Sequence, residues 1–70
     1  MKAYYDETDK ALIIESPGCD EVKIYKDGEF IAEATVPQDG IAKITNTDLV
    51  RSGDTLQIHK HVITIEEVTI

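Results

Sequence analysis

The stretch that most constrains the fold is Glu21–Val36, where two runs of alternating apolar and polar residues meet at Asp27-Gly28. An Asp-Gly pair between alternating runs is among the strongest local signals for a β-hairpin, because glycine readily adopts the positive φ that tight turns need. The rest of the chain repeats this arrangement of short apolar runs separated by Asp/Gly turns. The pattern therefore predicts an all-β chain.

The register of the hairpin follows from the two-residue period of side chains along a strand. A two-residue loop, Asp27-Gly28, would pair Val22 with Glu33 and bring a carboxylate onto the apolar face. A three-residue loop, 26–28, keeps that face free of charge. We therefore expect a type I turn with Gly28 in a G1 bulge. The expected core face is Val22, Ile24, Phe30, Ala32 and Ala34, and the expected outer face is Lys23, Tyr25, Glu29, Ile31, Glu33 and Thr35.

Short runs on either side of the hairpin predict the remaining strands. They are Met1–Tyr5, Ala11–Glu15, Ile41–Thr45, Thr55–Lys60 and Val62–Ile70, the last either continuous or broken near Glu66-Glu67. In the longest irregular piece, Asn46–Asp54, we expect Leu49 and Val50 to fill the core. A helical turn is compatible with Asp48–Arg51, with Thr47 or Asn46 as its cap. Seven or eight short strands predict a small antiparallel β-sandwich spanning residues 1–70 as one domain, with a small Greek-key barrel as the alternative.

Composition narrows the class of protein. The chain has 70 residues, no Trp and one Phe, so its core must be aliphatic. It holds no run near the roughly 20 apolar residues that span a bilayer and no apolar segment of a signal peptide, so we expect neither membrane insertion nor secretion. Cys19 is the single cysteine, which excludes an internal disulfide framework and fits a reducing compartment. The net charge of −7 disfavours binding to nucleic acid.

The segment Val22–Ile58 resembles bacterial and phage immunoglobulin-like and fibronectin-III-like modules. The matching pieces are Asp27-Gly28, Asp39-Gly40 and Leu49 with Gly53-Asp54, which cover about half of the chain. The resemblance implies an Ig-like sandwich without catalysis that spaces, decorates or binds. The chain departs from the pattern because it is shorter than the about 100 residues of an Ig domain and lacks the Cys…Trp…Cys core.

No residue pattern predicts an active site, a cofactor site or a metal site. His59 and His61 would share one face of a strand, but zinc normally takes three or four ligands. The turn carboxylates do not follow the spacing of a calcium loop. The chain is therefore expected not to be an enzyme.

The candidate interface residues lie at three places. Tyr25 and Ile31 are the large apolar side chains expected on the outer face of the hairpin, and tyrosine is favoured at interfaces. His59 and His61 are expected to face solvent. Val62 and Thr64 begin the strongly β-prone strand Val62–Ile70, which must be internal or pair with another chain, because an open edge invites aggregation.

These observations lead to two main hypotheses of function, beside a third in which His59 and His61 bind a metal or a small ligand. The first is a non-catalytic structural or binding module that acts on a protein partner or as a homo-oligomer. A phage-type virion assembly or decoration protein, cytoplasmic or virion-associated, fits this description. The second is an acidic inhibitor that blocks a nucleic-acid-binding protein.

Overall fold

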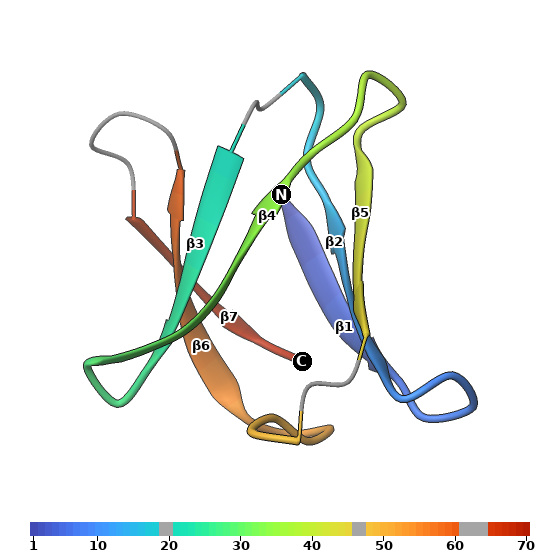
Figure 1. Cartoon of the computed structure of the whole chain (residues 1–70). Helices are drawn as coiled ribbons and strands as arrows, with labels where there is room; N and C mark the ends of the chain where they lie inside the picture. Colours follow the sequence, from blue (N-terminus) through green and yellow to red (C-terminus); the bar gives the residue numbers. More distant parts are fainter. Residues whose placement is uncertain (19–20, 46–47, 61–64) are drawn as a thin grey trace.

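Seven strands in two facing antiparallel sheets make up the computed structural model, which describes residues 1–18, 21–45, 48–60 and 65–70 (Figure 1). The strands are β1 (Lys2–Asp6), β2 (Ala11–Glu15), β3 (Glu21–Lys26), β4 (Glu29–Thr35), β5 (Ile41–Thr45), β6 (Thr55–Lys60) and β7 (Ile65–Thr69). One sheet has the order β1-β2-β5 and the other β4-β3-β6-β7. The described residues contain no helix, which confirms the predicted all-β fold of small-sandwich type.

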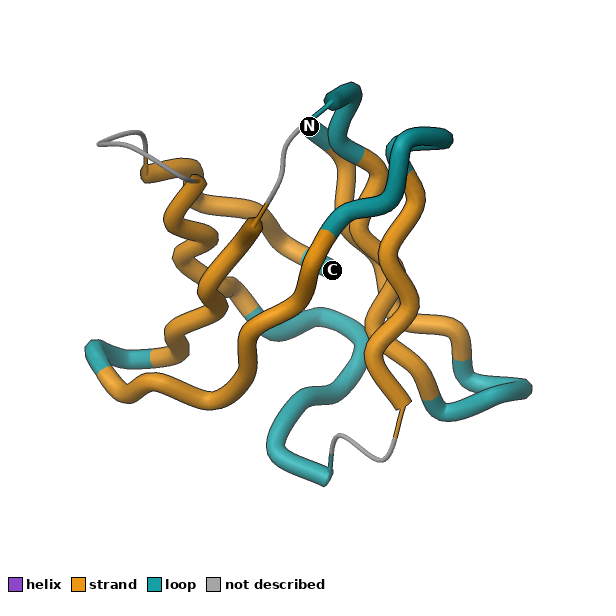
Figure 2. Tube along the Cα trace, turned by 45° about the horizontal axis from the view of Figure 1, so that its top comes forward, coloured by secondary structure: helices purple, strands orange, loops and turns teal. Residues whose placement is uncertain are grey.

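The two sheets approach each other at both corners. The hairpins β1–β2, β3–β4 and β6–β7 are joined by crossings from one sheet to the other after β2, β4 and β5. These crossings bring β1 beside β7 and β4 beside β5, with Cα atoms within 8 Å but without a hydrogen-bonded ladder. Figure 2 shows the two layers from a second direction. The corners keep all four edge strands close to the opposite sheet.

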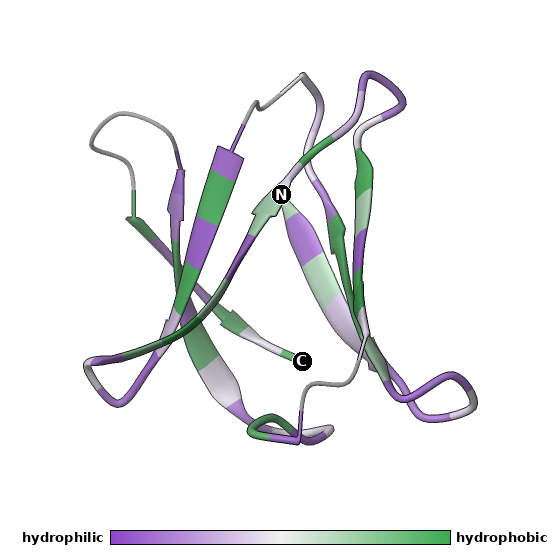
Figure 3. Ribbon diagram, viewed as in Figure 1, coloured by the Kyte–Doolittle hydropathy of each residue, from purple (hydrophilic) through white to green (hydrophobic). Residues whose placement is uncertain are grey.

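The core lies between the sheets and is aliphatic, as the composition predicts. Every second residue of β3 points into it, and the alternation of hydrophobic and hydrophilic residues along this strand is visible in Figure 3. Strand β2 is central in its sheet and buried along most of its length, including Ala11 and Ile13 on its outer side. The buried core cluster comprises Ala3, Leu12, Ile14, Val22, Ile24, Val36, Ala42, Val50, Leu56 and Ile58.

The β3–β4 hairpin corrects the expected register. Asp27 has φ 52° and Gly28 has φ 80°, so both central turn residues are left-handed, as in a two-residue type I′ turn. Tyr25 therefore pairs with Phe30, and the expected three-residue loop is wrong. The type I′ turn is favoured because its twist matches the right-handed twist of the strands. A type I turn alone lacks this match.

With a regular ladder, the two-residue turn would place Glu33 on the core face opposite Val22. A β-bulge in β4 prevents this. The register shifts beside Ile24, which pairs with Ala32, and this leaves Ile31 as the extra residue on β4. Beyond the bulge, Ala32 and Ala34 face the core as predicted, and Glu33 faces outward. Two expectations are wrong: Phe30 is 48% exposed on the outer face, and Ile31 packs against the core.

The loop between β5 and β6 contributes one core residue, not two. Val50 is 3% exposed, as expected, whereas Leu49 is 60% exposed. No helical turn forms over Asp48–Arg51; the segment is closed by Asp54, whose Oδ2 accepts the Arg51 amide at 2.9 Å. A single side chain fills the space under the loop, and its neighbour points to solvent. The expected caps of that turn, Asn46 and Thr47, lie outside the described residues.

Strand β7 lies at the edge of its sheet, where the sequence led us to expect an internal strand or one paired with another chain. It runs without a break through Glu66 and Glu67 and pairs only with β6 among the described strands. Two features protect the edge: β1 lies beside it at the corner, and consecutive glutamates place charge on both of its faces.

Candidate interaction surface

The outer face of the four-stranded sheet carries a group of aromatic and apolar side chains that point away from the core. The register places eight outward side chains in two rows across β4, β3, β6 and β7. One row is Phe30, Tyr25, Gln57 and Glu67, and the other is Glu33, Lys23, His59 and Ile65. We call these eight residues the aromatic face.

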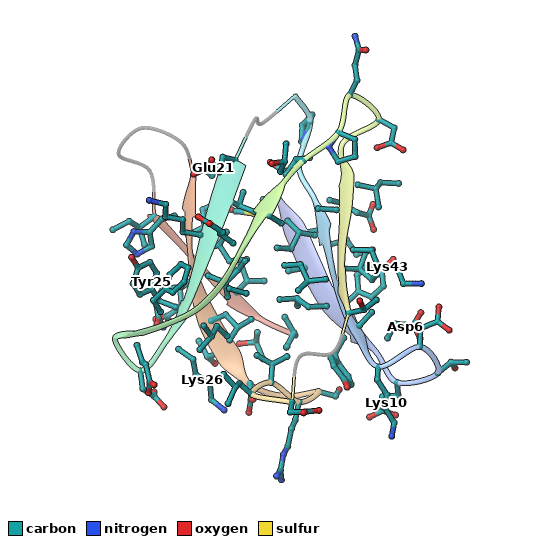
Figure 4. The ribbon with its side chains drawn as sticks, viewed as in Figure 1. Asp6, Lys10, Glu21, Tyr25, Lys26 and Lys43 are labelled. Atoms are coloured by element: carbon teal, nitrogen blue, oxygen red, sulfur yellow. The ribbon has the colours of Figure 1, made fainter. Side chains whose placement is uncertain are left out.

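Three rings lie next to one another on the aromatic face. The Tyr25 and Phe30 rings lie edge to face, with centroids 5.5 Å apart and an interplanar angle of 71°. On the other side of Tyr25 the His59 ring is tilted by 32°, with its centroid at 4.3 Å. Tyr25 points away from the opposite sheet (Figure 4). Tyr25 and His59 are half-buried, whereas Phe30 and Ile65 keep about half of their surface in water, at 48% and 59%.

Local structure explains this arrangement. The two-residue turn and the bulge after Phe30 send its side chain outward, directly opposite Tyr25. His59 is diagonal to Tyr25 across β3 and β6, and diagonal neighbours on one face lie within reach of ring side chains. The rings are therefore ordered against each other before any ligand arrives.

Two of the five polar members of the aromatic face are acidic. Glu33 lies opposite Lys23 in the ladder, and Glu67 lies opposite Gln57, whose Nε2 is 3.5 Å from Glu67 Oε2. Neither glutamate takes part in an ion pair among the residues that the structure describes. Lys23 is the one lysine or arginine among the eight.

The structure brings together only part of the interface predicted from sequence. Tyr25 and His59 are in contact, as members of the same face. Ile31 is not on this face, since the bulge turns it toward the core. His61, Val62 and Thr64 lie outside the described residues, as does Cys19. Phe30 and Ile65 were missed, although the Asp-Gly signal for a two-residue turn already favoured an outward Phe30.

Elsewhere on the molecule, residues that the structure describes line a smaller and a larger hollow. The smaller, about 260 Å³, lies beside the β3–β4 turn and is lined by Lys26, Asp27, Glu29, Ile31 and Leu49. The larger, about 440 Å³, is a wide depression lined by Met1, Lys2, Glu15, Ser16, Pro17, Asp39, Gly40 and Ile41. Ser16 is 2% exposed, and its amide donates to the Gly40 carbonyl at 2.7 Å. Both hollows are lined by acidic, basic and apolar side chains. Neither lining resembles a catalytic site.

The smaller hollow is bounded by an ionic anchor. Lys26 Nζ lies 2.9 Å from Asp54 Oδ2 and donates to the Leu49 carbonyl at 3.3 Å, which ties the hairpin to the 48–54 loop (Figure 4). The hydrogen bond from Lys26, followed by that from the Arg51 amide, lowers the pKa of Asp54 from its ordinary value. Lys26 and Asp54 are each paired with groups of their own chain, which indicates a structural role.

Two further ion pairs involve Lys60 of β6 and Lys43 of β5. Lys60 Nζ is 2.9 Å from Glu66 Oε1, and this hydrogen bond lowers the pKa of Glu66, with a smaller contribution from the chain's amino terminus. On the opposite sheet Lys43 Nζ is 2.7 Å from Asp9 Oδ2, which raises the pKa of Lys43. Each of these lysines is thus engaged with a carboxylate of its own chain.

Chemically, the aromatic face is suited to binding. In the described residues, no three His, Cys, Asp or Glu side chains come together as a metal site would require. The same residues include no helix that is long and apolar enough to cross a bilayer. Comparison of the chain with protein-family profiles, with curated proteins and with solved structures finds no match.

Proposed function

We propose that this chain is a non-catalytic binding module that contacts a protein partner, or another copy of itself, through the aromatic face. The observation that carries the proposal is the exposure of Phe30 and Ile65 beside an ordered Tyr25–His59 pair. Aromatic residues supply much of the binding energy of protein interfaces, since they bury a large apolar area with few rotatable bonds. Rings that are already ordered lose little entropy on binding.

The outer face of the other sheet is less suited to this role. It also exposes large side chains, Tyr4 at 40% and Ile41 at 48%. However, the Lys2 ammonium lies 5.7 Å from the centroid of the Tyr4 ring, and Lys43 is held beside Asp9. The Lys2 ammonium therefore already lies near the Tyr4 ring in the free protein.

The biological setting that we favour comes from the resemblance of Val22–Ile58 to bacterial and phage Ig-like modules. It supports an Ig-like assembly or decoration protein, cytoplasmic or virion-associated, with a protein and not a nucleic acid as its partner. A second function, an acidic inhibitor of a nucleic-acid-binding protein, is favoured by one observation: Glu33 and Glu67 flank the rings without an ion-pair partner among the described residues.

Site-specific photo-crosslinking tests the proposal. Benzoylphenylalanine is placed at Phe30 in one variant and at Ile41 in a second, because both native side chains are 48% exposed but lie on opposite sheets. In an extract of the source cells, we expect a defined adduct from position 30 and none from position 41. Equal adducts from both positions, or an adduct from position 41 alone, would contradict the choice of face. The mass of the adduct separates a second copy from a different partner.

A further inference from the structure

We infer that the partner of the aromatic face presents arginine side chains, set apart so that they reach Glu33 and Glu67 while an apolar group covers the rings. This inference rests on the proposed function and names the chemistry of the partner. The register places the two glutamates at opposite corners of the face, one on β4 and one on β7. Phe30 and Ile65 occupy the other two corners, so each edge strand contributes one acidic and one apolar side chain.

The negative charge of the aromatic face favours a positively charged partner. Glu33 and Glu67 outnumber the single Lys23, and the whole chain carries a net charge of −7. A second copy placed face to face would double this excess of negative charge, and like charges across an interface are costly. A basic partner is attracted at long range and can pair with both carboxylates.

The rings favour arginine over lysine. A guanidinium binds the face of an aromatic ring and at the same time donates paired hydrogen bonds to a carboxylate. Glu33 is the next outward residue after Phe30 on β4, since the bulge and Ala32 lie between them on the inner side. An arginine at this corner can therefore meet the exposed Phe30 ring and the Glu33 carboxylate together.

The spacing of the glutamates constrains the partner further. Three strand-to-strand steps separate β4 from β7 and two residue steps separate the rows, which puts the Cα atoms of the two glutamates about 16 Å apart. An extended peptide covers that distance in about five residues. Two arginines with an apolar residue between them are thus the smallest ligand that engages both corners.

A peptide titration followed by NMR tests the inference. The probe is an acetylated and amidated peptide with arginines at positions 1 and 6, a leucine between them and glycines elsewhere. Its control replaces both arginines with citrulline, which has nearly the same shape but no charge. We expect the arginine peptide to shift the signals of Phe30, Tyr25 and His59 in low salt, with much smaller shifts in 0.5 M NaCl.

Matched variants identify the groups that bind. We expect Glu33→Gln and Glu67→Gln each to weaken binding by about 1.5- to 5-fold. Phe30→Ala should weaken it by about 2- to 5-fold through the loss of the ring. The control Glu15→Gln removes the same charge from the outer face of the other sheet and should leave affinity unchanged within error.

Three results would overturn the inference. The first is an equal loss of affinity from Glu15→Gln, which would mean that only net charge matters. The second is equal binding of the citrulline peptide. The third is a concentration-dependent shift of the same signals without peptide, which would assign the face to a second copy. If the crosslink at position 30 still forms while the arginine peptide fails, the binding function stands and only the partner chemistry is wrong.

Discussion

Replacement of Phe30 by alanine tests the fold and the aromatic face in one experiment. In the structure Phe30 follows the two-residue turn, points to solvent and is 48% exposed. In a hairpin with a three-residue loop the same ring would be opposite Ile24 in the core. The two arrangements predict different losses of stability for the same substitution.

The structure allows the expected loss to be worked out. Full burial of a Phe side chain is worth about 1.5–3 kcal/mol, so the half that is removed from water contributes about 0.8–1.5 kcal/mol. The edge-to-face contact with Tyr25 adds about 0.5–1.5 kcal/mol. Phe30→Ala should thus cost about 1.3–3 kcal/mol, whereas loss of a core Phe costs about 3–5 kcal/mol. A chain of 70 residues has a stability of about 3.5–10 kcal/mol, so the variant stays folded.

Urea unfolding followed by circular dichroism measures this loss. A second variant, Phe30→Lys, distinguishes an exposed from a buried position. On an exposed edge strand a lysine is well tolerated, so Phe30→Lys should fold and unfold cooperatively. In a core it would bury a charge and abolish folding, which is the expected result for the control Ile24→Lys, since Ile24 is fully buried. An unfolded Phe30→Lys protein, or a loss above 4 kcal/mol for Phe30→Ala, would refute the outward placement of the ring.

Three further predictions concern the β3–β4 turn, the 48–54 loop and the loss of stability at acid pH. Gly28→Ala should cost about 1–2 kcal/mol in urea unfolding, because its φ of 80° is left-handed while no atom crowds the added methyl group; an unchanged midpoint would contradict the type I′ turn. Val50→Ala should cost about 1–2.5 kcal/mol and Leu49→Ala under 0.5 kcal/mol, since one is buried and the other exposed; equal losses would mean that both residues fill the core. The pKa values of Asp54 and Glu66 are lowered from 3.8 and 4.5, so their ion pairs stabilise the fold at neutral pH, and this stabilisation is lost as the pH falls through the lowered values. Asp54→Asn should therefore flatten the fall of the urea midpoint between pH 5 and pH 2, and an unchanged slope would show that its ion pair does not stabilise the fold.

The position of β7 at a sheet edge bears on how the chain avoids aggregation. An edge strand rich in Val, Ile and Thr is a template for pairing with other chains. Here the consecutive residues Glu66 and Glu67 put a carboxylate on each side of the strand, and β1 lies next to it. The same glutamates thus serve separate purposes: Glu66 pairs with Lys60, and Glu67 belongs to the aromatic face.

Local sequence was sufficient to locate the strands and turns of this protein. Alternation with a period of two marked β3 and β4, and Asp-Gly marked the turn between them, because these signals act between residues that are close in sequence. Tyr25 and His59 were correctly assigned to the surface for the same reason.

Only the tertiary structure decided where the hairpin accommodates its extra residue. The extra residue can enter the turn or the strand, and either choice keeps Val22, Ile24, Ala32 and Ala34 on one side. The alternation of apolar and polar residues therefore could not distinguish the two, although Asp-Gly favoured the shorter turn. The structure places the extra residue at Ile31, and this choice exposes Phe30 and assembles the rings of the aromatic face.

The same limit applies wherever two neighbouring apolar residues compete for one place in the core. Leu49 and Val50 are equally apolar in sequence, yet only Val50 is buried, because the space under the loop is set by strands far away along the chain. Likewise, the β propensity of the last strand indicated its existence but not its neighbours. Pairing between distant strands depends on how all seven strands pack together, and the sequence of one segment does not determine that packing.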